Sequence, residues 1–307
     1  MLPLISVIIP TFNRWPLVGE AVESVLGQSV SNFELIVVDD GSTDGTAKEL
    51  ARFGSRLHFF ATPRGGVAAA RNFGVSRARG RYLAFLDSDD LWRPRKLEVQ
   101  TSFIEQHPEV QVCQTEEIWI RNGIRVNSKL IHRKPSGDIF RRSLKLCLIS
   151  PSAVMMTKEL FERLGGFDVT FPVCEDYDLW LRIAANHSVA LIPEPLVIKR
   201  GGHGDQLSRS TWGMDRYRVE ALRKVLRSDI SGEQRMAALE VLRRKVAILA
   251  RGARKRGKER DAAQYEVALM EFDRENLNVG NRDSQLCARE KFSSANPGAV
   301  AELGRSG

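Results

Sequence analysis

Two clusters of carboxylates each follow directly on an apolar run of the kind that forms a buried strand. They are Asp39-Asp40 after residues 35–38, and Asp87-Ser88-Asp89-Asp90 after residues 82–86. Continuous apolar runs of this length are typical of central strands in a parallel sheet that is covered on both faces. In open α/β sheets, ligands bind just beyond the carboxyl ends of such strands. The two clusters therefore predict one ligand site at that edge of a sheet.

The residue types in these clusters favour chemistry with a cation and phosphate oxygens. Five carboxylates at one edge repel one another, so they need a cation or hydrogen-bond donors to offset their charge. Asp87, Ser88 and Asp89 offer hard oxygen ligands suited to Mg²⁺ or Mn²⁺ shared with a diphosphate. In the alternative interpretation, each cluster only forms a turn and caps the next helix. The recurrence of the clusters at the same end of two strands favours the ligand site.

The first 90 residues contain the elements that would position these side chains. Predicted strands and helices alternate with short turns, which is typical of a parallel α/β sheet. The predicted strands are residues 6–9, 33–38, 57–61 and 82–86. The predicted helices between them are residues 17–26, 42–52 and 68–79, the second of them capped by Ser42 or Thr43. Pro94 suits the first turn of a further helix that reaches Gln106.

The pattern changes beyond about residue 107. Asn122-Gly123 between apolar stretches predicts a hairpin over residues 117–126. Further predicted elements are a strand at 153–156, a short helix that ends at Gly165-Gly166, a helix at 176–185 and a last strand at 197–199. Apolar residues spaced by three and four predict helices at 216–226, 233–250 and 258–271, with a turn at Gly257.

These patterns divide the chain into three parts. Residues 1–210 form an α/β domain, with halves at about 1–107 and 108–210. Residues 211–281 form a helical extension. Residues 282–307 are rich in polar and small side chains, and we expect this tail to be poorly ordered.

Composition and charge are those of a globular protein that meets anionic partners. The 307 residues are 43% hydrophobic and 27% charged, enough for a substantial core. No apolar run reaches the roughly 20 residues that a membrane helix needs, and the apolar start runs into Pro10 without a basic lead, unlike a signal peptide. Four cysteines without metal-like spacing predict free thiols in a reducing cytoplasm. The net charge of +8 suits nucleotides, phospholipid head groups or lipid diphosphates.

Six motifs occur in a fixed order along the chain. They are residues 6–14 (SVIIPTFNR), 24–29 (SVLGQS), 34–44 (ELIVVDDGSTD), 70–74 (ARNFG), 85–90 (FLDSDD) and 174–180 (CEDYDLW). With these motifs, residues 4–210 resemble the family 2 glycosyltransferases of the GT-A fold, an α/β fold with a mixed, mostly parallel sheet. The resemblance implies transfer of a sugar from a nucleotide-sugar, usually a UDP-sugar, with inversion and with Mn²⁺ or Mg²⁺.

The resemblance also implies a role for each residue that matches a family motif. Those that would bind the nucleotide-sugar are Pro10, Thr11, Phe12, Asp39, Asp40, Arg71, Asp87 and Ser88. In that set, Asp39 would accept a hydrogen bond from uracil, Arg71 would lie near the nucleotide or its phosphates, and Asp87 would contact the ribose or donor sugar. Asp89 and the late His203 would bind the metal. Asp176 matches the family's general base, with Glu175 beside it.

The chemistry of the implied reaction explains these residue types. A leaving diphosphate gains negative charge that a metal can neutralise, and an acceptor hydroxyl needs a carboxylate that takes its proton. One base without a protein nucleophile fits a single displacement, and hence inversion. Simpler interpretations stay open: Asp176 as a helix N-cap, Arg71 paired with a surface acid, and His203 as a loop residue without a ligand.

Two departures from the family pattern bear on the substrates. The loop at 62–67 (TPRGGV) differs from relatives, which often place an Asn before a single Gly. The Gln-x-x-Arg-Trp signature of processive synthases is absent from the sequence. We therefore expect non-processive addition of one sugar to a glycan or lipid-linked saccharide acceptor.

Other functional classes fit the sequence less well. The loop after the first strand has no glycine, which disfavours a sugar nucleotidyltransferase. A catalytically silent GT-A-like scaffold that binds nucleotide-sugar in a glycan assembly complex stays open. Basic residues without interleaved aromatics disfavour a nucleic-acid module. The basic run at 251–260 is a solvated helix face or, in a sharper hypothesis, a peripheral contact at the inner face of a membrane.

Overall fold

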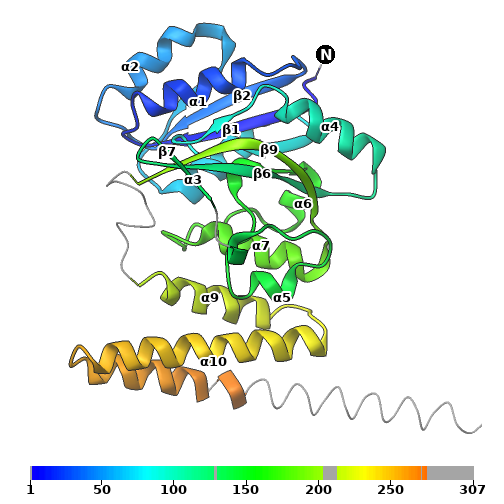
Figure 1. Ribbon diagram of the computed structural model, residues 1–307. Helices are drawn as coiled ribbons and strands as arrows, with labels where there is room; N and C mark the ends of the chain where they lie inside the picture. Colours follow the sequence, from blue (N-terminus) through cyan, green and yellow to red (C-terminus); the bar gives the residue numbers. More distant parts are fainter. Residues whose placement is uncertain (1, 128–129, 203–212, 271, 275–307) are drawn as a thin grey trace, which may run out of the picture. The chain divides into compact units, whose positions relative to one another are not determined.

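The structure is a computed structural model that describes residues 2–127, 130–202, 213–270 and 272–274 (Figure 1). The chain forms two compact units, Met1–Leu242 and Arg243–Gly307, and each is described by itself. A sheet with the strand order β3-β2-β1-β4-β8-β6-β9-β5 is the centre of the first unit, and β7 pairs with β6. This confirms the predicted α/β fold with a mixed, mostly parallel sheet and a helical C-terminal part.

The first half of the sheet is parallel, as predicted. Its strands are β3 (His58–Ala61), β2 (Phe33–Asp39), β1 (Ile5–Thr11) and β4 (Tyr82–Phe85). β1 is buried along its whole length, and so is β2 after its first residue. Strands of this kind are covered on both faces, which is why they appear as unbroken apolar runs in the sequence.

The second half of the sheet is mixed. Its strands are β8 (Val154–Thr157), β6 (Val112–Arg121), β9 (Ala190–Gly201), β5 (Leu91–Trp92) and β7 (Ile124–Val126). β6 and β7 form the predicted hairpin, with Asn122 and Gly123 both at positive φ. The predicted last strand at 197–199 is much longer in the structure. Pro193 and Pro195 interrupt the apolar pattern of β9, and its pairing with β6 shifts register near these prolines.

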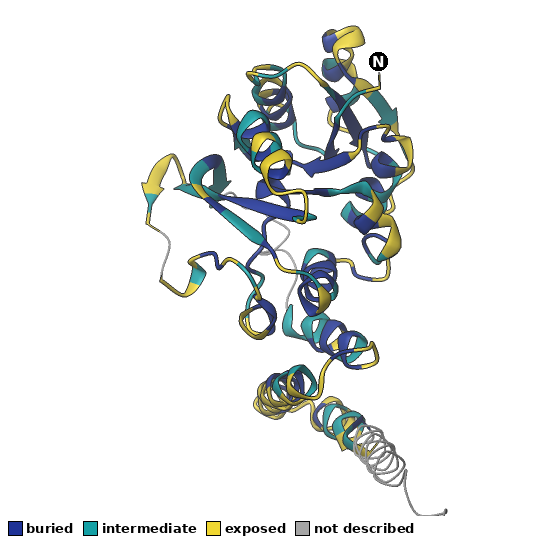
Figure 2. Ribbon diagram, turned by 90° about the vertical axis from the view of Figure 1, so that its right-hand side faces the viewer, coloured by how far each residue is buried: buried dark blue, intermediate teal, exposed yellow. Residues whose placement is uncertain are grey.

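Helices cover both faces of the sheet (Figures 1 and 2). One core lies between the sheet and α1 (Leu17–Leu26), α2 (Thr46–Leu50) with the 3-10 turn Ala51–Arg56, and α4 (Lys96–Gln106). On the other face lie α3 (Val67–Arg77), α6 (Lys158–Arg163) and α7 (Glu175–Asn186). Short helical segments are α5 (Phe140–Ser143), Leu130–His132 and Pro151–Ala153. The residues coloured as buried in Figure 2 lie along the sheet and on the sides of the helices that face it.

Two predicted helix starts are wrong. α2 begins at Thr46, and the Asp44 carboxylate accepts a hydrogen bond from the Thr46 amide at 3.0 Å, so neither Ser42 nor Thr43 is its cap. The Ser42 hydroxyl instead accepts from the Asn13 amide at 2.7 Å, which ties the end of β2 to the end of β1. α4 begins two residues after Pro94, because the chain first forms the two-residue strand β5.

The C-terminal part is helical, as predicted. α9 (Asp215–Leu226) and α10 (Gly232–Arg254) are followed by a helix over residues 259–270, and Gly257 turns the chain with a φ of 68°. Ala250, Ala253 and Ala262 form a small core in the second unit. The helices described in the structure include none that is long and apolar enough to cross a membrane. The predicted division at residue 210 remains a prediction, and the tail at 282–307 lies outside the described residues.

Candidate active site

The two carboxylate clusters lie close together, at the carboxyl ends of two parallel strands. β1 lies between β2 and β4 and is parallel to both, so the carboxyl ends of the three strands meet at one edge. The strand order reverses at this point, where open α/β sheets bind ligands. Asp39 ends β2, and Asp87 comes two residues after the end of β4. The predicted position of the clusters is confirmed.

Asp39 and Asp40 are buried and organise the backbone at the end of β2. Asp39 Oδ1 accepts a hydrogen bond from the Ser42 amide at 3.0 Å. The two carboxylate oxygens of Asp40 accept from the Gly65 and Gly66 amides at 2.7 and 2.9 Å. Asp40 therefore holds the loop between β3 and α3, and any part it has in nucleotide binding acts through that loop.

The second cluster contains open and enclosed carboxylates. The side chains of Asp87 and Asp89 are 27% and 19% exposed. Asp90 is buried, and its two oxygens accept from the Ser152 hydroxyl at 2.7 Å and the Arg200 amide at 2.9 Å. Burial, with a contribution from the neighbouring charges of Asp89 and Asp87, raises the pKa of Asp90 well above its ordinary value. Asp90 thus has a structural role, because it joins the loop after β4 to β9.

Arg71 connects the two halves of the site. Its guanidinium donates to Asp87 Oδ1 at 2.7 Å and to Glu175 Oε1 at 2.6 Å. Glu175 lies 104 positions after Arg71 in the sequence. Burial disfavours the Arg71 cation, but Asp87 and Glu175 outweigh this effect and raise the Arg71 pKa. The side chain is only 4% exposed, so pairing with a surface acid is the wrong interpretation. Its Nε has no partner among the described residues.

Glu175 and Asp176 differ in how far solvent and substrate can reach them. Glu175 is buried and held by Arg71, whereas Asp176 is half-buried. Burial and the charge of Asp176 raise the pKa of Glu175 to about 7, against the lowering effect of Arg71. The N-cap of α7 is Cys174, with a φ of 66°, so Asp176 lies in the first turn and is not the cap. The Cys147 thiol donates to Asp176 Oδ2 at 3.4 Å.

Two of the residues predicted to bind the nucleotide-sugar near the end of β1 lie within the strand itself. Pro10 and Thr11 are buried residues of β1, which stays paired with β2 as far as Thr11, so they are not loop residues. Phe12 is the first residue after the strand and is half-buried. Ser88 is buried in the loop after β4. Of these four residues, only Phe12 presents a partly open ring beside the end of β2.

The sequence analysis missed a lysine that offsets the charge of this edge. Lys199 on β9 donates to the Ser150 hydroxyl at 3.2 Å. Burial disfavours its cation, but Glu117, Asp90 and Asp87 outweigh burial and raise the Lys199 pKa. The sequence of β9 does not indicate that Lys199 offsets these charges, because its partners come from distant segments of the chain. The structure thus supplies donors and a cation for the crowded carboxylates, as the sequence required.

The described residues suit a metal ion that is shared with phosphate oxygens. No group of three or more His, Cys, Asp or Glu side chains converges to enclose a metal in the part of the chain that the structure describes. His203 lies outside that part. Asp87 and Asp89 are hard oxygen donors with open surface, and Mg²⁺-type sites often combine one or two carboxylates with substrate phosphates. The donor set therefore fits a divalent ion only together with a diphosphate.

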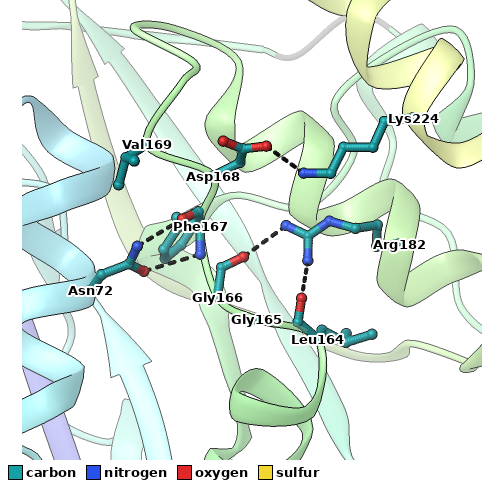
Figure 3. A pocket seen from close by; sticks show the side chains of 9 residues that line it. All are labelled: Asn72, Leu164, Gly165, Gly166, Phe167, Asp168, Val169, Arg182 and Lys224. Atoms are coloured by element: carbon teal, nitrogen blue, oxygen red, sulfur yellow. Dashed lines mark hydrogen bonds and ion pairs between the residues drawn. The ribbon is translucent and has the colours of Figure 1, made fainter.

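A separate cavity of about 390 Å³ is lined by Phe167 and its neighbours (Figure 3). Its lining residues are Asn72, Leu164, Gly165, Gly166, Phe167, Asp168, Val169, Arg182 and Lys224. Lys224 donates to Asp168 at 2.6 Å, and Arg182 donates to the carbonyls of Leu164 and Gly166. None of the residues predicted for the site lines this cavity, so it is distinct from the carboxylate edge.

Comparisons with known proteins match this sequence to glycosyltransferases. The sequence model described as "Glycosyl transferase family 2" matches residues 6–165. An uncharacterized glycosyltransferase of Rickettsia felis is 36% identical over 200 residues, which cover 62% of this chain and 32% of that protein. The Escherichia coli protein named UDP-Glc:alpha-D-GlcNAc-diphosphoundecaprenol beta-1,3-glucosyltransferase WfgD is 34% identical over 191 residues, covering 62% of this chain and 73% of its own.

Two solved structures share the fold. S. aureus TarS 1-349 in complex with UDP-GlcNAc has a TM-score of 0.63 at 22% identity, and the match covers 78% of this chain and 70% of that one. The mannosyltransferase PcManGT from Pyrobaculum calidifontis in complex with GDP-Man and Mn²⁺ has a TM-score of 0.57 at 20% identity, covering 89% and 85%. The chain spans about a third of the length of three Rickettsia relatives and 64% of two others. By its motifs, its fold and the match over residues 6–165, the chain belongs to glycosyltransferase family 2.

Proposed function

We propose that this chain transfers one sugar from a UDP-sugar to a hydroxyl group of a glycan or lipid-linked saccharide, with inversion at the anomeric carbon. The observation that carries the proposal is the link made by Arg71 between Asp87, at the predicted donor edge, and Glu175, at the start of α7. Because Asp176 is the neighbour of Glu175, this link supports a position of Asp176 beside the edge where a nucleotide-sugar would bind. A single displacement needs the sugar donor and the general base to be held in a fixed position relative to each other. The Asp87–Arg71–Glu175 network can supply that fixed position.

Asp176 is the general base in this proposal. Its half-buried carboxylate can receive a proton from an acceptor hydroxyl as that oxygen attacks the sugar. Base catalysis of this kind typically contributes about 10²- to 10⁴-fold in rate. Glu175 is a positioning residue, because it is buried and its Oε1 already accepts from Arg71 at 2.6 Å. It orients Arg71 instead of meeting the acceptor.

Departure of the nucleoside diphosphate requires positive charge near its phosphates. Arg71 of α3 is permanently cationic and pairs with Asp87 after β4, and Arg14 Nη1 is 3.4 Å from Asp89 Oδ2. Asp89, with Asp87, would bind Mn²⁺ or Mg²⁺, which when bound supplies Lewis-acid stabilisation of the leaving phosphate. The Pyrobaculum calidifontis mannosyltransferase was solved with Mn²⁺, which supports a metal-dependent reaction for this chain. We also propose that His203 completes the set.

The nature of the substrates is supported by relatives. The E. coli relative is named for UDP-Glc and for a diphosphoundecaprenol-linked acceptor, and TarS was solved with UDP-GlcNAc. PcManGT instead was solved with GDP-Man, so GDP-sugars belong in any donor panel. We propose that residues 108–210 form the acceptor half, because Asp176 belongs to them. Both Asp89 and Asp176 are present, which disfavours a silent scaffold.

Calorimetric titration with nucleoside diphosphates tests the donor part of this proposal. UDP is expected to bind the full chain more tightly with Mn²⁺ than with a chelator, and GDP is expected to bind more weakly. Asp89→Ala should remove the gain from Mn²⁺, because it deletes a proposed ligand. Asp229→Ala is the matched control, since Asp229 is an exposed aspartate outside the site. Failure of every nucleoside diphosphate to bind the wild-type chain would contradict the proposal.

A further inference from the structure

The buried guanidinium of Arg71 contacts an aromatic ring that lies outside the predicted site. Its central carbon is 5.1 Å from the centre of the Phe167 ring, and Phe167 is only 2% exposed. Asp87 and Glu175 hold Arg71 by its two terminal nitrogens, while its Nε has no partner among the described residues. An aromatic face attracts a guanidinium most strongly where water is excluded. Phe167 therefore gives Arg71 a third support, besides the two carboxylates.

Asn72, the next residue of α3, fixes the backbone of Phe167 (Figure 3). The Asn72 Nδ2 donates to the Phe167 carbonyl at 2.7 Å, and the Phe167 amide donates to Asn72 Oδ1 at 3.0 Å. Phe167 lies 95 positions after Asn72, in the segment between α6 and α7. The turn of α3 that carries Arg71 thus also holds the residue whose ring contacts Arg71.

The chain around Phe167 leaves its ring little freedom to move away from Arg71. Gly166 has a φ of 71°, and a Cβ built there would lie 2.9 Å from Asn72 Oδ1, so a larger residue would push Asn72 away. Arg182 of α7 donates to the Gly166 carbonyl at 2.7 Å. The aromatic rings that pack around Phe167 are those of Phe85, Phe161 and Trp180. In a closely packed interior, a ring held in this way stays in one position.

We propose that Asn72 and Phe167 are positioning residues for the reaction, because they hold the Arg71 guanidinium in place between Asp87 and Glu175. The inference rests on the proposed function, in which Arg71 supplies charge near the leaving diphosphate, and both residues act through Arg71. Without the aromatic face, the guanidinium can shift or tilt into the space that the ring had filled. A displacement of about 1 Å can lower a reaction rate by about 100-fold, so this support bears on catalysis.

Phe167→Leu tests the aromatic support, because leucine keeps an apolar side chain but has no aromatic face. We expect kcat for UDP release to fall about 2- to 30-fold, which corresponds to the loss of one cation–π contact. The affinity for UDP should stay within about threefold of wild type, because the charge that Arg71 stabilises develops in the transition state.

Phe161→Leu is the matched control. Phe161 is also buried, its ring packs against Phe167 at 5.5 Å, and among the described residues it makes no cation–π contact with Arg71. This variant should lower the melting temperature about as much as Phe167→Leu does, while kcat stays nearly unchanged. Asn72→Asp is nearly isosteric but cannot donate to the Phe167 carbonyl, so its kcat should fall as in Phe167→Leu.

Phe167→Leu in an Arg71→Ala chain shows whether the effect passes through Arg71. It should lower the residual kcat no further, and the loss of melting temperature should be smaller than the sum of the two single losses. An equal fall in kcat in both backgrounds, or in Phe161→Leu and Phe167→Leu, would overturn the proposal. A wild-type chain that releases no UDP from any donor would instead overturn the proposed function. The melting temperatures would then decide, because additive losses would show that Phe167 does not support Arg71.

Discussion

Individual carboxylates at this edge differ by the donors that surround them. Asp40 and Asp90 accept hydrogen bonds on both oxygens, so they hold backbone segments together. Asp87, Asp89 and Asp176 keep partly open surface. Chemistry needs a carboxylate that a substrate or a metal can reach, so these three are the functional candidates.

Replacement of Asp176 by Asn is expected to lower kcat by about 10²- to 10⁴-fold while the affinity for UDP stays within about twofold of wild type. The physical reason is that the amide cannot take a proton, whereas the proposed nucleotide contacts are made by other residues, at the sheet edge. UDP release and UDP titration measure the two quantities.

Glu175→Gln is the matched variant at the neighbouring position. It keeps the size of the side chain and a hydrogen-bond acceptor for Arg71, so a smaller fall in kcat is expected. A Glu175→Gln chain as inactive as Asp176→Asn, with UDP binding intact in both, would place the base at Glu175 instead.

The residue types of the site could be predicted from the sequence. Which carboxylates are enclosed by hydrogen-bond donors and which stay open could not. Asp39 and Asp87 follow apolar runs, and parallel strands bring such positions to one edge. The donors that enclose Asp90 come from Ser152 and Arg200, which are 62 and 110 positions away. Only the fold brings them together. Lys199 was missed for the same reason.

Among the elements, α3 carries Arg71 and packs very closely on the sheet. A Cβ built at Gly74 would lie 2.6 Å from Ile8 Cγ2 and 3.3 Å from Val38 Cγ2. Gly74→Ala is therefore expected to lower the free energy of unfolding by about 1–3 kcal/mol and to reduce kcat by displacing Arg71. Urea unfolding and the UDP-release assay measure the two effects.

Gly232→Ala is the control for this prediction. Gly232 is the first residue of α10, and no heavy atom lies within 4 Å of a Cβ built there. Alanine should leave stability unchanged or raise it slightly, because glycine is a poor helix former. Equal stability of wild type and Gly74→Ala would show that α3 can move away from β1 without cost.

Within α4, Lys96 is a buried amine whose charge should make stability depend on pH. Its Nζ donates to Gln100 Oε1 at 2.6 Å and lies 3.9 Å from the centre of the Trp92 ring. Burial lowers the Lys96 pKa from 10.5 to about 7. Between these values the unfolded chain binds more protons than the folded chain, so this group makes the free energy of unfolding rise with pH from about 7 to 10.5.

Lys96→Met should remove that rise. The gain in the free energy of unfolding relative to wild type is expected to be larger at pH 6 than at pH 9.5, by about 3 kcal/mol. Urea unfolding at the two pH values measures it. Lys48→Met, at an exposed position, should show the same small effect at both. A Lys96→Met effect that is independent of pH would contradict the lowered pKa.

Long elements with a clear period were predictable, whereas short or interrupted ones were not. α1 and β2 match their predicted ranges because their apolar residues repeat without a break. β9 was predicted as three residues because prolines at 193 and 195 obscure a strand that spans Ala190–Gly201. β5 has only two residues and exists because it pairs with β9, which no local pattern can indicate.

The whole molecule is basic, and part of that charge lies in the second compact unit. The run at 251–260 contains six basic residues and one acid, and all six basic side chains are exposed. We propose that this run contacts anionic phospholipid, which would suit a lipid-linked acceptor. Each basic residue near an anionic surface contributes about 1 kcal/mol, and salt screens the attraction.

Vesicle sedimentation tests this contact. The full chain should bind vesicles that contain anionic phospholipid but not purely zwitterionic ones, and 0.5 M salt, on the order of several times physiological ionic strength, should weaken binding. Charge reversal of Lys255, Lys258 and Arg260 to Glu should weaken it at least about tenfold. Reversal at the exposed positions Lys48, Arg52 and Arg125 is the control. Equal loss in both triple variants would show that only net charge matters.

We expect this chain to turn over a nucleotide-sugar between Asp87 and Asp89, at the sheet edge, and Asp176, at the start of α7. The most direct test is the release of nucleoside diphosphate by the purified chain, with Mn²⁺ and a panel of UDP- and GDP-sugars. We expect slow release from one UDP-sugar, lost on chelation and in Asp89→Ala, and unchanged in Asp229→Ala. A chain that binds UDP with Mn²⁺ but releases no diphosphate from any donor, even with lipid-linked saccharide acceptors added, would contradict catalysis and indicate a nucleotide-sugar-binding scaffold.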